Sequence, residues 1–532
     1  MNGTTTIPAP TIEYAQLAPL LVVFGAAVVG VLVEALAPRH LRRAIHQPLT
    51  MLSLVGAFAL TIIQAFAGTR NAAAMGAVAV DGPALFIWGA VLVLAFVSIV
   101  LINDADQFVP QASAVPGSRE EEDAIAAGAA HTEVYPLALF TVGGMLLFSS
   151  ANDLLTMFVG LEVMSLPLYL LCGLARRRRL LSQEASVKYF LLGAFSSAIF
   201  LYGMALIYGF AGSVNLTAIN DALGTVSGQD TLLYAAVALL GVGLLFKIGA
   251  APFQAWKPDV YQGAPTPVTA LMASGVLVAA FGAVLRVFWV ALGNLDWDWR
   301  PIMWGIAILT MVVGAVLAIT QTDIKRMLAY SSIAHAGFLL VGLVATHDEP
   351  KVDPQTGQTV LTAAQQNAES LSGILFYLLA YGLATVGAFA VITMVRDAGG
   401  EAGHLSRWAG LGKRSPLLAG VFAFFLLAFA GIPLTSGFFG KYAVFSAAVA
   451  ADAVGLVIVG VVTSAIAAFF YVRVIVLMFF SDPAPDGPTI ALPSTGTAMV
   501  VGFAALATVV LGVFPQPVLD LADTAAQSLF VR

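Results

Sequence analysis

The stretch from Asp230 to Trp256 reads DTLLYAAVALLGVGLLFKIGAAPFQAW and decides the fold class of this chain. Most of it is an apolar run of about 20 residues, the length that crosses the hydrocarbon core of a bilayer. Lys247 is the only charged residue inside the run, and Pro252 follows it closely. Proline lacks an N–H and clashes with the carbonyl of Ile248, so we expect a membrane-spanning helix that kinks or opens there.

Long apolar runs recur along the whole chain. Of its 532 residues, 59% are hydrophobic and only 10% are charged, whereas a soluble domain has about a quarter of its residues charged. The runs are continuous and do not alternate, which predicts an all-α polytopic membrane protein and excludes a β-barrel. We count about fourteen transmembrane helices, centred near Ala26, Ala57, Leu94, Thr141, Leu161, Ile199, Leu240, Ala279, Leu309, Leu339, Gly382, Phe425, Ala465 and Ala505.

The basic residues support this count. If the loop with Arg176 to Arg179 faces the cytoplasm, alternation also places Arg39 to Arg43 and Lys325-Arg326 there, as the positive-inside rule requires. Both termini are then expected on the non-cytoplasmic side. Arg286 and Arg473 lie near helix ends, where we expect them to snorkel to the interface. Two polar, acidic stretches, 103–132 and 346–370, are expected to be solvated loops.

Three charged residues lie where hydrocarbon is expected, namely Glu162, Lys247 and Lys441. An ionised side chain at the middle of a bilayer costs about 2.5–3.5 kcal/mol even on the mildest scale, so such residues indicate a function. One interpretation is a structural ion pair between Glu162 and Lys247 that locks two helices together. The other is proton transfer, because burial penalises the charged forms of both groups and lets each take up and release a proton.

Lys188 and His335 are further candidates for proton transfer. Lys188 is six residues into its helix after Ser182, so snorkelling or pairing with Glu184 explains it equally well. His335 lies within a helix and could relay protons near neutral pH, although a lone helical histidine is often simply hydrogen-bonded. The remaining histidines, at positions 40, 46, 131, 347 and 404, are expected in loops.

A second predicted span is interrupted in the same way as the first. Residues 429–437 read FAGIPLTSG, and Pro433 removes the helical bond to the carbonyl of Phe429. The two breaks are five helices apart, and an odd spacing gives opposite orientations in the membrane, as in inverted repeats. Lys247 precedes its proline and Lys441 follows its own, so the expected match is in helix shape and not in the placement of charge. Kinks of purely structural origin remain an alternative.

Three motifs resemble those of the antiporter-like subunits of respiratory complex I. They are FKIGAAPFQAWKPDVYQGAPTP at 246–267, DIKRMLAYSSIAH at 323–335 and GIPLTSGFFGK at 431–441. The resemblance covers roughly residues 150 to 480. It implies that Lys247 holds the transferable proton, that Glu162 modulates it, and that Lys441 lies on the exit side. It also implies that Lys188 is the family's sixth-helix lysine and that His335 relays protons between the two halves.

One position departs from the family pattern. Members commonly have a lysine before the sequence Val-Ala-Ala-Phe in the eighth helix, where this chain has Leu277. The usual bridge between the halves is therefore missing. Ordered water with His335, or a nearby polar group, would have to replace it.

The resemblance and the repeats predict a division of the chain. We expect three N-terminal helices and a cytoplasmic loop in residues 1–132, a first repeat in 133–292, a second inverted repeat in 299–480, and a final helix and tail in 495–532. The expected location is the bacterial plasma membrane.

The function predicted from these features is a proton channel driven by quinone reduction in other subunits. No cofactor or metal is expected here, since Cys172 is the single cysteine and no clear dinucleotide motif occurs. NADH, FMN, iron–sulfur clusters and quinone are expected in partner subunits. The expected partners include other antiporter-like subunits and the lipid bilayer. Nucleic acid is not an expected partner. Two alternatives are a subunit of a multisubunit cation/proton antiporter and an autonomous transporter of an organic substrate. For the latter, the breaks offer too few polar side chains.

Overall fold

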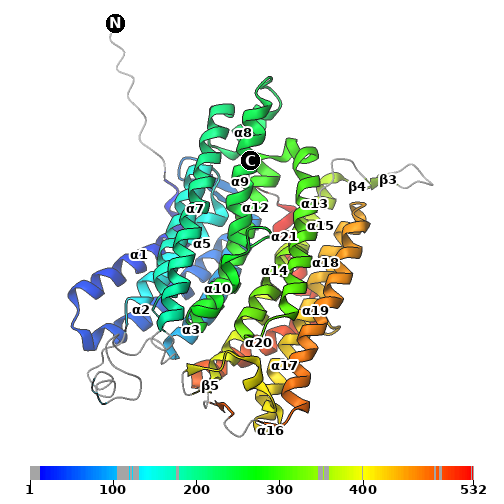
Figure 1. Ribbon diagram of the computed structural model, residues 1–532. Helices are drawn as coiled ribbons and strands as arrows, with labels where there is room; N and C mark the ends of the chain where they lie inside the picture. The colour runs from blue at the N-terminus through cyan, green and yellow to red at the C-terminus, as the bar shows by residue number, and fades with distance from the viewer. Residues whose placement is uncertain are drawn as a thin grey trace.

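The computed structural model is a bundle of long helices that run roughly side by side (Figure 1). It describes residues 12–104, 131–174, 179–345, 351–352, 359–397, 400–483, 487–490, 494–528 and 530, together with Arg119 and Asp123. The predicted loop 103–132 lies largely outside these residues, as do residues 346–350 and 353–358 of the second predicted loop and Arg176 to Arg178. Helix α15 begins at Ala363, so the end of the second predicted loop is helical.

The first half of the chain forms the helices α1 Tyr14–Leu36, α2 Arg39–Phe66, α3 Gly82–Asp104, α5 Val134–Ser150, α6 Leu154–Cys172, α7 Arg179–Ala211, α8 Leu216–Leu223, α9 Asp230–Ile248, α10 Trp256–Gly263, α11 Thr266–Leu271, η2 Met272–Val276, α12 Leu277–Leu285, η3 Arg286–Ala291 and η4 Gly293–Leu295. The second half forms α13 Asp296–Ile319, α14 Ile324–Val344, α15 Ala363–Met394, η5 Leu405–Trp408, α16 Leu411–Arg414, α17 Pro416–Ala430, α18 Ser436–Ala450, α19 Val454–Phe480, α20 Thr495–Val513 and α21 Gln516–Gln527.

Short antiparallel strands lie only between helices in the described parts of the chain. They are β1 Asn71–Ala73 with β2 Val78–Val80, β3 Lys351–Val352 with β4 Thr359–Leu361, and a three-stranded sheet in the order β6 Gly400–Glu401, β5 Val395–Asp397, β7 Thr489–Ile490.

The prediction of about fourteen apolar helices is confirmed. All fourteen predicted centres lie in helices, and twelve of the described helical segments are long and apolar enough to cross a membrane. The other two centres, Thr141 and Phe425, lie in the shorter apolar helices α5 and α17. Helix α17 is short because it is the first half of the second broken span, which α18 continues.

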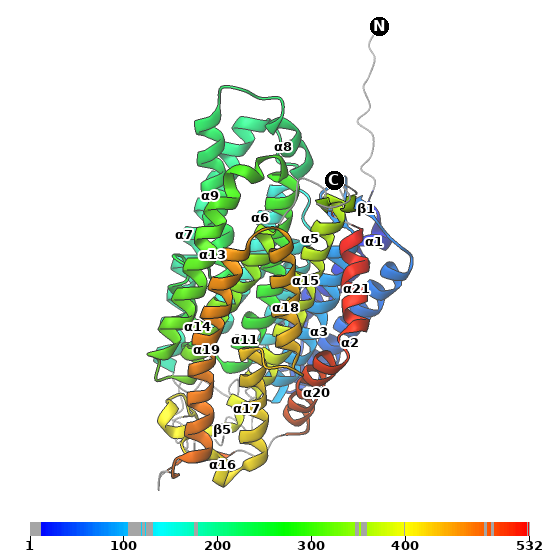
Figure 2. The same cartoon turned by 90° about the vertical axis from the view of Figure 1, so that its right-hand side faces the viewer.

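The bundle has inner and outer helices. The segment Thr266–Ala291 is completely buried, and α14 and α15 are nearly so. In contrast, α1, α2, α7, α13, α19 and α20 expose much of their surface, and their exposed side chains are largely leucine, valine, isoleucine and phenylalanine. An apolar outer surface of this kind suits lipid, since lipid accepts apolar side chains. Figure 2 shows α20 and α21 at one side of the bundle, near α3 and α15.

Two helix pairs are held together by glycines in the same way. A Cβ atom on Gly144 of α5 would lie 2.3 Å from the backbone N of Met164 on α6. A Cβ atom on Gly314 of α13 would lie 2.4 Å from the backbone N of Ala334 on α14. Only glycine permits such close backbone contact between membrane helices. The pairs α5–α6 and α13–α14 therefore correspond to each other, as expected for an internal repeat.

Candidate functional site

The first broken span opens at a glycine and not at the proline. Helix α9 ends at Ile248, and Gly249 follows in the left-handed conformation with φ 75°. This is a common way for a helix to end, because glycine has no Cβ to clash. The carbonyls of the last turn lose their helical partners here. The indole Nε1 of Trp256 donates to the Phe246 carbonyl at 2.9 Å, and Lys257 Nζ donates to the Ile248 carbonyl at 3.2 Å.

The second broken span has the same construction. Helix α17 ends at Ala430, and Gly431 follows with φ 83°. Lys441, on the second half of the span, donates from Nζ to the carbonyls of Phe429 and Ala430, each at 3.0 Å. Its third partner is the hydroxyl of Ser464 on α19, at 2.7 Å.

In both spans, therefore, a lysine from the second half caps the first half. A Cβ on Gly249 would meet Lys257 Cδ at 2.7 Å, and a Cβ on Gly431 would meet Lys441 Cδ at 3.1 Å, so each lysine lies against the glycine that ends the helix. The expectation that the two breaks differ in the placement of charge holds for Lys247, which has no counterpart in α17, but it overlooked a lysine that the breaks share. Lys257 corresponds in position to Lys441.

Sequence reasoning missed Lys257 because that lysine follows the break, beyond the apolar run. Its place after the break, like that of Lys441, was the signal that could have identified it.

Lys247 is buried in the last turn of α9 without a carboxylate partner. Its Nζ donates to Ser165 Oγ on α6 at 2.7 Å and contacts the Tyr189 hydroxyl on α7 at 3.4 Å. Glu162, one turn before Ser165, acts on Lys247 electrostatically but forms no ion pair with it within 4.0 Å. The Glu162 Oε1 atom is buried and has no hydrogen-bond partner. The structure therefore does not contain the fixed Glu162–Lys247 ion pair that the first interpretation proposed.

His335 is buried at the centre of α14 among tyrosines. Its Nδ1 lies 2.6 Å from the Tyr377 hydroxyl and its Nε2 lies 3.3 Å from the Tyr471 hydroxyl. The ring also stacks on Tyr381, with centroids 4.4 Å apart. Lys441 and Lys257 are the lysines that act electrostatically on this imidazole. His335 thus lies between the capping lysines of the two broken spans.

Lys188 belongs to a different environment. Its side chain is 41% exposed and pairs with Glu184 at 2.6 Å, which confirms that expected partner, and with Asp259 on α10 at 2.7 Å. Arg326 forms an ion pair with the same Asp259. The result is a charged cluster at the end of the bundle that the basic residues predict to be cytoplasmic.

A second pair extends this cluster. Lys325 Nζ lies 3.4 Å from Glu401 Oε2 and donates to the Ala264 carbonyl at 2.9 Å. Thr266 donates to the same Glu401 carboxylate. Sequence reasoning missed Asp259 and Glu401, since each lies in a connecting segment whose partners come from distant helices.

Three sequence-based placements are wrong, one of them that of His40, which lies in α2 and not in a loop. Arg286 does not snorkel: it is fully buried, its Nη2 lies 2.8 Å from Asp81 Oδ1, and its Nε donates to the Ser149 carbonyl at 2.8 Å. His46 is not in a loop but buried within α2, where its Nε2 lies 2.8 Å from Glu34 Oε1. In each of these two cases a carboxylate outside the residue's own helix lies within 3 Å of the buried polar group, and the sequence of that helix does not show it.

Leu277 is buried, with 3% exposure, where the family pattern has lysine. It follows the π-helical turn η2, and a second such turn, η3, ends the same span. Leu277 belongs to the main hydrophobic cluster. Among the described residues, no three His, Cys, Asp or Glu side chains lie close enough together to hold a metal ion.

Comparison with known proteins gives a family match over most of the buried polar region. Residues 151–350 and 354–467 match the family described as NADH:quinone oxidoreductase/Mrp antiporter, TM. A relative from Rhodococcus opacus, named NADH-quinone oxidoreductase subunit N, is 59% identical over 98% of this chain and 97% of its own length.

Two solved structures have the same fold. A chain of respiratory complex I from Thermus thermophilus is 34% identical, with a TM-score of 0.73 over 95% of this chain and 99% of that chain. A chain of the Mrp complex from Dietzia has a TM-score of 0.78 over 97% of both chains, but only 21% identity, so it shows likeness of fold alone.

Proposed function

This chain belongs to the NADH:quinone oxidoreductase/Mrp antiporter membrane-subunit family, and from that premise we propose that it carries protons across the membrane through Lys247, Lys257, His335 and Lys441. It is an antiporter-like subunit of the membrane arm of an NADH:quinone oxidoreductase, beside other antiporter-like subunits. It contributes to a proton-translocating enzyme without performing the redox chemistry itself. NADH, FMN, iron–sulfur clusters and quinone would be bound by partner subunits, and quinone reduction there would drive the protons here.

One observation carries the proposal. The amino groups of Lys247, Lys257 and Lys441 are all buried, and each is bonded to hydroxyl or carbonyl oxygens, with no carboxylate of the described residues at ion-pair distance. A fixed counter-ion would hold a lysine permanently charged, and breaking such a buried pair is costly. Hydroxyl and carbonyl oxygens accept a hydrogen bond from either the charged or the neutral amine. Each lysine can therefore gain and lose a proton while its partners stay in place; at Lys441, which has three partners, the Ser464 hydroxyl would turn to donate to the neutral amine.

Protons would enter at the exposed cluster of Lys188 and Asp259. From there, Lys247 is the first buried acceptor, and the nearby Glu162 carboxylate would favour its protonated form. Because Glu162 makes no direct contact with Lys247, a small movement of α6 would change this influence without breaking a bond.

Lys257 would supply the connection between the two halves. It lies beyond the break from Lys247, and its charge reaches His335. The hydroxyls of Tyr377 and Tyr471 bracket the imidazole, so the ring can accept a proton on one nitrogen and release one from the other. Lys441 then receives the proton, and the Ser464 hydroxyl on the exposed helix α19 marks the exit side. In this arrangement Lys257 takes the place of the lysine missing at Leu277.

The two broken spans would belong to two inverted repeats, residues 133–292 and 299–480. The glycine contacts at Gly144 and Gly314 and the lysine caps at Lys257 and Lys441 support this division. The protein is a multi-pass membrane protein. We place it in the bacterial plasma membrane with both termini on the non-cytoplasmic side, since basic residues then concentrate in the cytoplasm.

The test is replacement of Lys247 by alanine in the assembled complex. We expect proton uptake into inverted membrane vesicles to be abolished while the amount of complex stays unchanged. Lys413→Ala is the control, because Lys413 is half exposed and pairs with the surface residue Asp482. Lys247→Met serves if alanine impairs assembly, since it keeps the bulk of the side chain. Full-rate pumping in an assembled Lys247 variant would remove this lysine from the path.

A further inference from the structure

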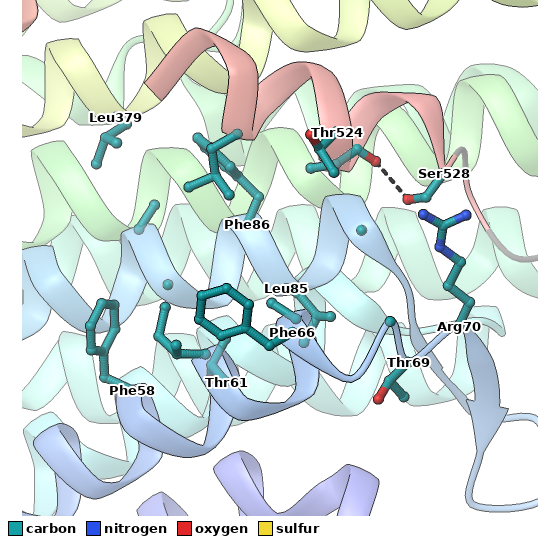
Figure 3. Close-up of a pocket in the computed structure, with 18 of the residues that line it drawn as sticks. Phe58, Thr61, Phe66, Thr69, Arg70, Leu85, Phe86, Leu379, Thr524 and Ser528 are labelled. Carbon is teal, nitrogen blue, oxygen red and sulfur yellow. Dashed lines mark hydrogen bonds between the residues drawn. The ribbon is translucent and has the colours of Figure 1, made fainter. Parts of the chain in front are cut away.

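An apolar groove lies between the N-terminal helices and the last helix of the chain. It has a volume of about 390 Å³ and is lined by α2, α3, α15 and the C-terminal helix α21. Figure 3 shows Phe58 and Phe66 from α2, Leu85 and Phe86 from α3, and Leu379 from α15 around it. Nearly all of its lining is hydrocarbon, so a bound molecule must be mostly apolar.

The groove has the depth of one leaflet. Along α3 it extends from Gly82 to Val93, which is about 16 Å at 1.5 Å per residue. This is about half of the roughly 30 Å hydrocarbon core of a bilayer. The groove begins at the end of α2 and the start of α3, which the basic residues place on the non-cytoplasmic side.

The groove is also narrow. Its volume of about 390 Å³ is a small fraction of the volume that a helical segment of the same length occupies. A helix with its side chains is about 10–12 Å wide and does not fit. Beside the groove, helix α21 contacts the start of α3 closely, since a Cβ on Gly82 would lie 1.9 Å from Ser528 Oγ and 2.4 Å from the Ala525 carbonyl. A single hydrocarbon chain is the shape that this space accommodates.

One cation lies at the mouth of the groove. Arg70 is exposed and forms no hydrogen bond or ion pair with any residue that the structure describes. The Thr69 and Ser528 hydroxyls lie at the same end (Figure 3). Ser528 donates its proton to the Ala525 carbonyl at 2.7 Å. The nearest acidic side chains of α21, Asp520 and Asp523, do not line the groove, and Asp520 accepts from Gln516 at 2.7 Å. Arginine is well suited to bind a phosphate with two parallel hydrogen bonds.

We propose that this groove binds a phospholipid of the non-cytoplasmic leaflet. One acyl chain lies between α2, α3 and α21, and the phosphate contacts the Arg70 guanidinium. The lipid would fill the space between the N-terminal helices and α21 beside the contact that α21 makes with α3. A quinone has no phosphate for Arg70, and a partner's helix is too wide for the groove. This proposal does not depend on the proton route.

The test uses the purified complex in vesicles of phosphatidylcholine and phosphatidylglycerol. A phosphatidylglycerol with a photoactivatable acyl chain is irradiated, and labelled peptides of α3 and α21 are measured by mass spectrometry. Gly89→Leu fills the groove, since its first carbon would lie 3.8 Å from Phe58 Cε2 without a clash. The matched control is Gly25→Leu, at a position of α1 with no atom within 4 Å.

We expect at least a fivefold loss of labelling in Gly89→Leu and no loss in Gly25→Leu. Arg70→Gln should lower labelling by about threefold, because an exposed charge contact contributes modestly. Equal labelling in wild type and Gly89→Leu would overturn the proposal. So would a photoactivatable quinone that labels these peptides as strongly as the lipid does, or density for a partner's peptide in the groove. Pumping is not the readout, so failure of the proton route leaves this result unaffected.

Discussion

Replacing Ser165 by alanine tests the environment of Lys247 directly. The Ser165 hydroxyl accepts from Lys247 Nζ at 2.7 Å, whereas the only other contact, the Tyr189 hydroxyl, is at 3.4 Å. A hydrogen bond to a charged group is worth about 1.5–3 kcal/mol. Ser165 is 1% exposed, so we expect no bulk water to replace its hydroxyl. The protonated form of Lys247 should lose about 1–1.5 kcal/mol more than the neutral form, whose hydrogen bond is weaker, so the ratio of protonated to neutral amine should fall roughly tenfold.

The measurement is the initial rate of proton uptake into inverted vesicles at neutral pH, divided by the amount of assembled complex. We expect a roughly tenfold fall in Ser165→Ala and substantial recovery in Ser165→Thr, which restores the oxygen. Ser196→Ala is the control, since this buried serine on α7 reaches the Gly243 carbonyl only at 3.5 Å. A wild-type rate in Ser165→Ala, or an equal fall in both alanine variants, would refute the reasoning.

Three further predictions concern other buried positions. Lys257→Met should stop proton pumping as completely as loss of Lys247 does, whereas Lys257→Arg should keep part of the pumping rate. Normal pumping by an assembled methionine variant would exclude Lys257 from the route. Leu277→Lys should be tolerated if water occupies that depth, and failure of the variant to assemble would instead indicate dry packing. Arg286→Met should destabilise the subunit by about 3–5 kcal/mol, because it removes the cation that pairs with the buried Asp81 carboxylate. Thermal unfolding checks this prediction, and the double variant with Asp81→Leu should recover much of the loss; no recovery would show that the ion pair is not the cause.

The sequence by itself determined the number and position of the spans. A run of about 20 apolar residues has only one way to cross a membrane with its backbone satisfied, so composition alone predicts a helix there. The two breaks were also predictable, because glycine and proline act on their own backbone. Even so, the position of the first break was predicted a few residues too late, at Pro252. The helix ends earlier, at Gly249, because glycine adopts the left-handed conformation without strain.

Only the tertiary structure decided how the buried charges are satisfied. Lys247, Lys257 and Arg286 are all cations inside or beside apolar runs, yet the first binds a hydroxyl, the second a helix-end carbonyl and the third a carboxylate. Asp81, the partner of Arg286, is about two hundred positions away in the chain. Hydrophobicity and helix breaks are local properties that a sequence displays directly. A counter-ion is a property of the packing, and packing brings together residues that the sequence keeps far apart.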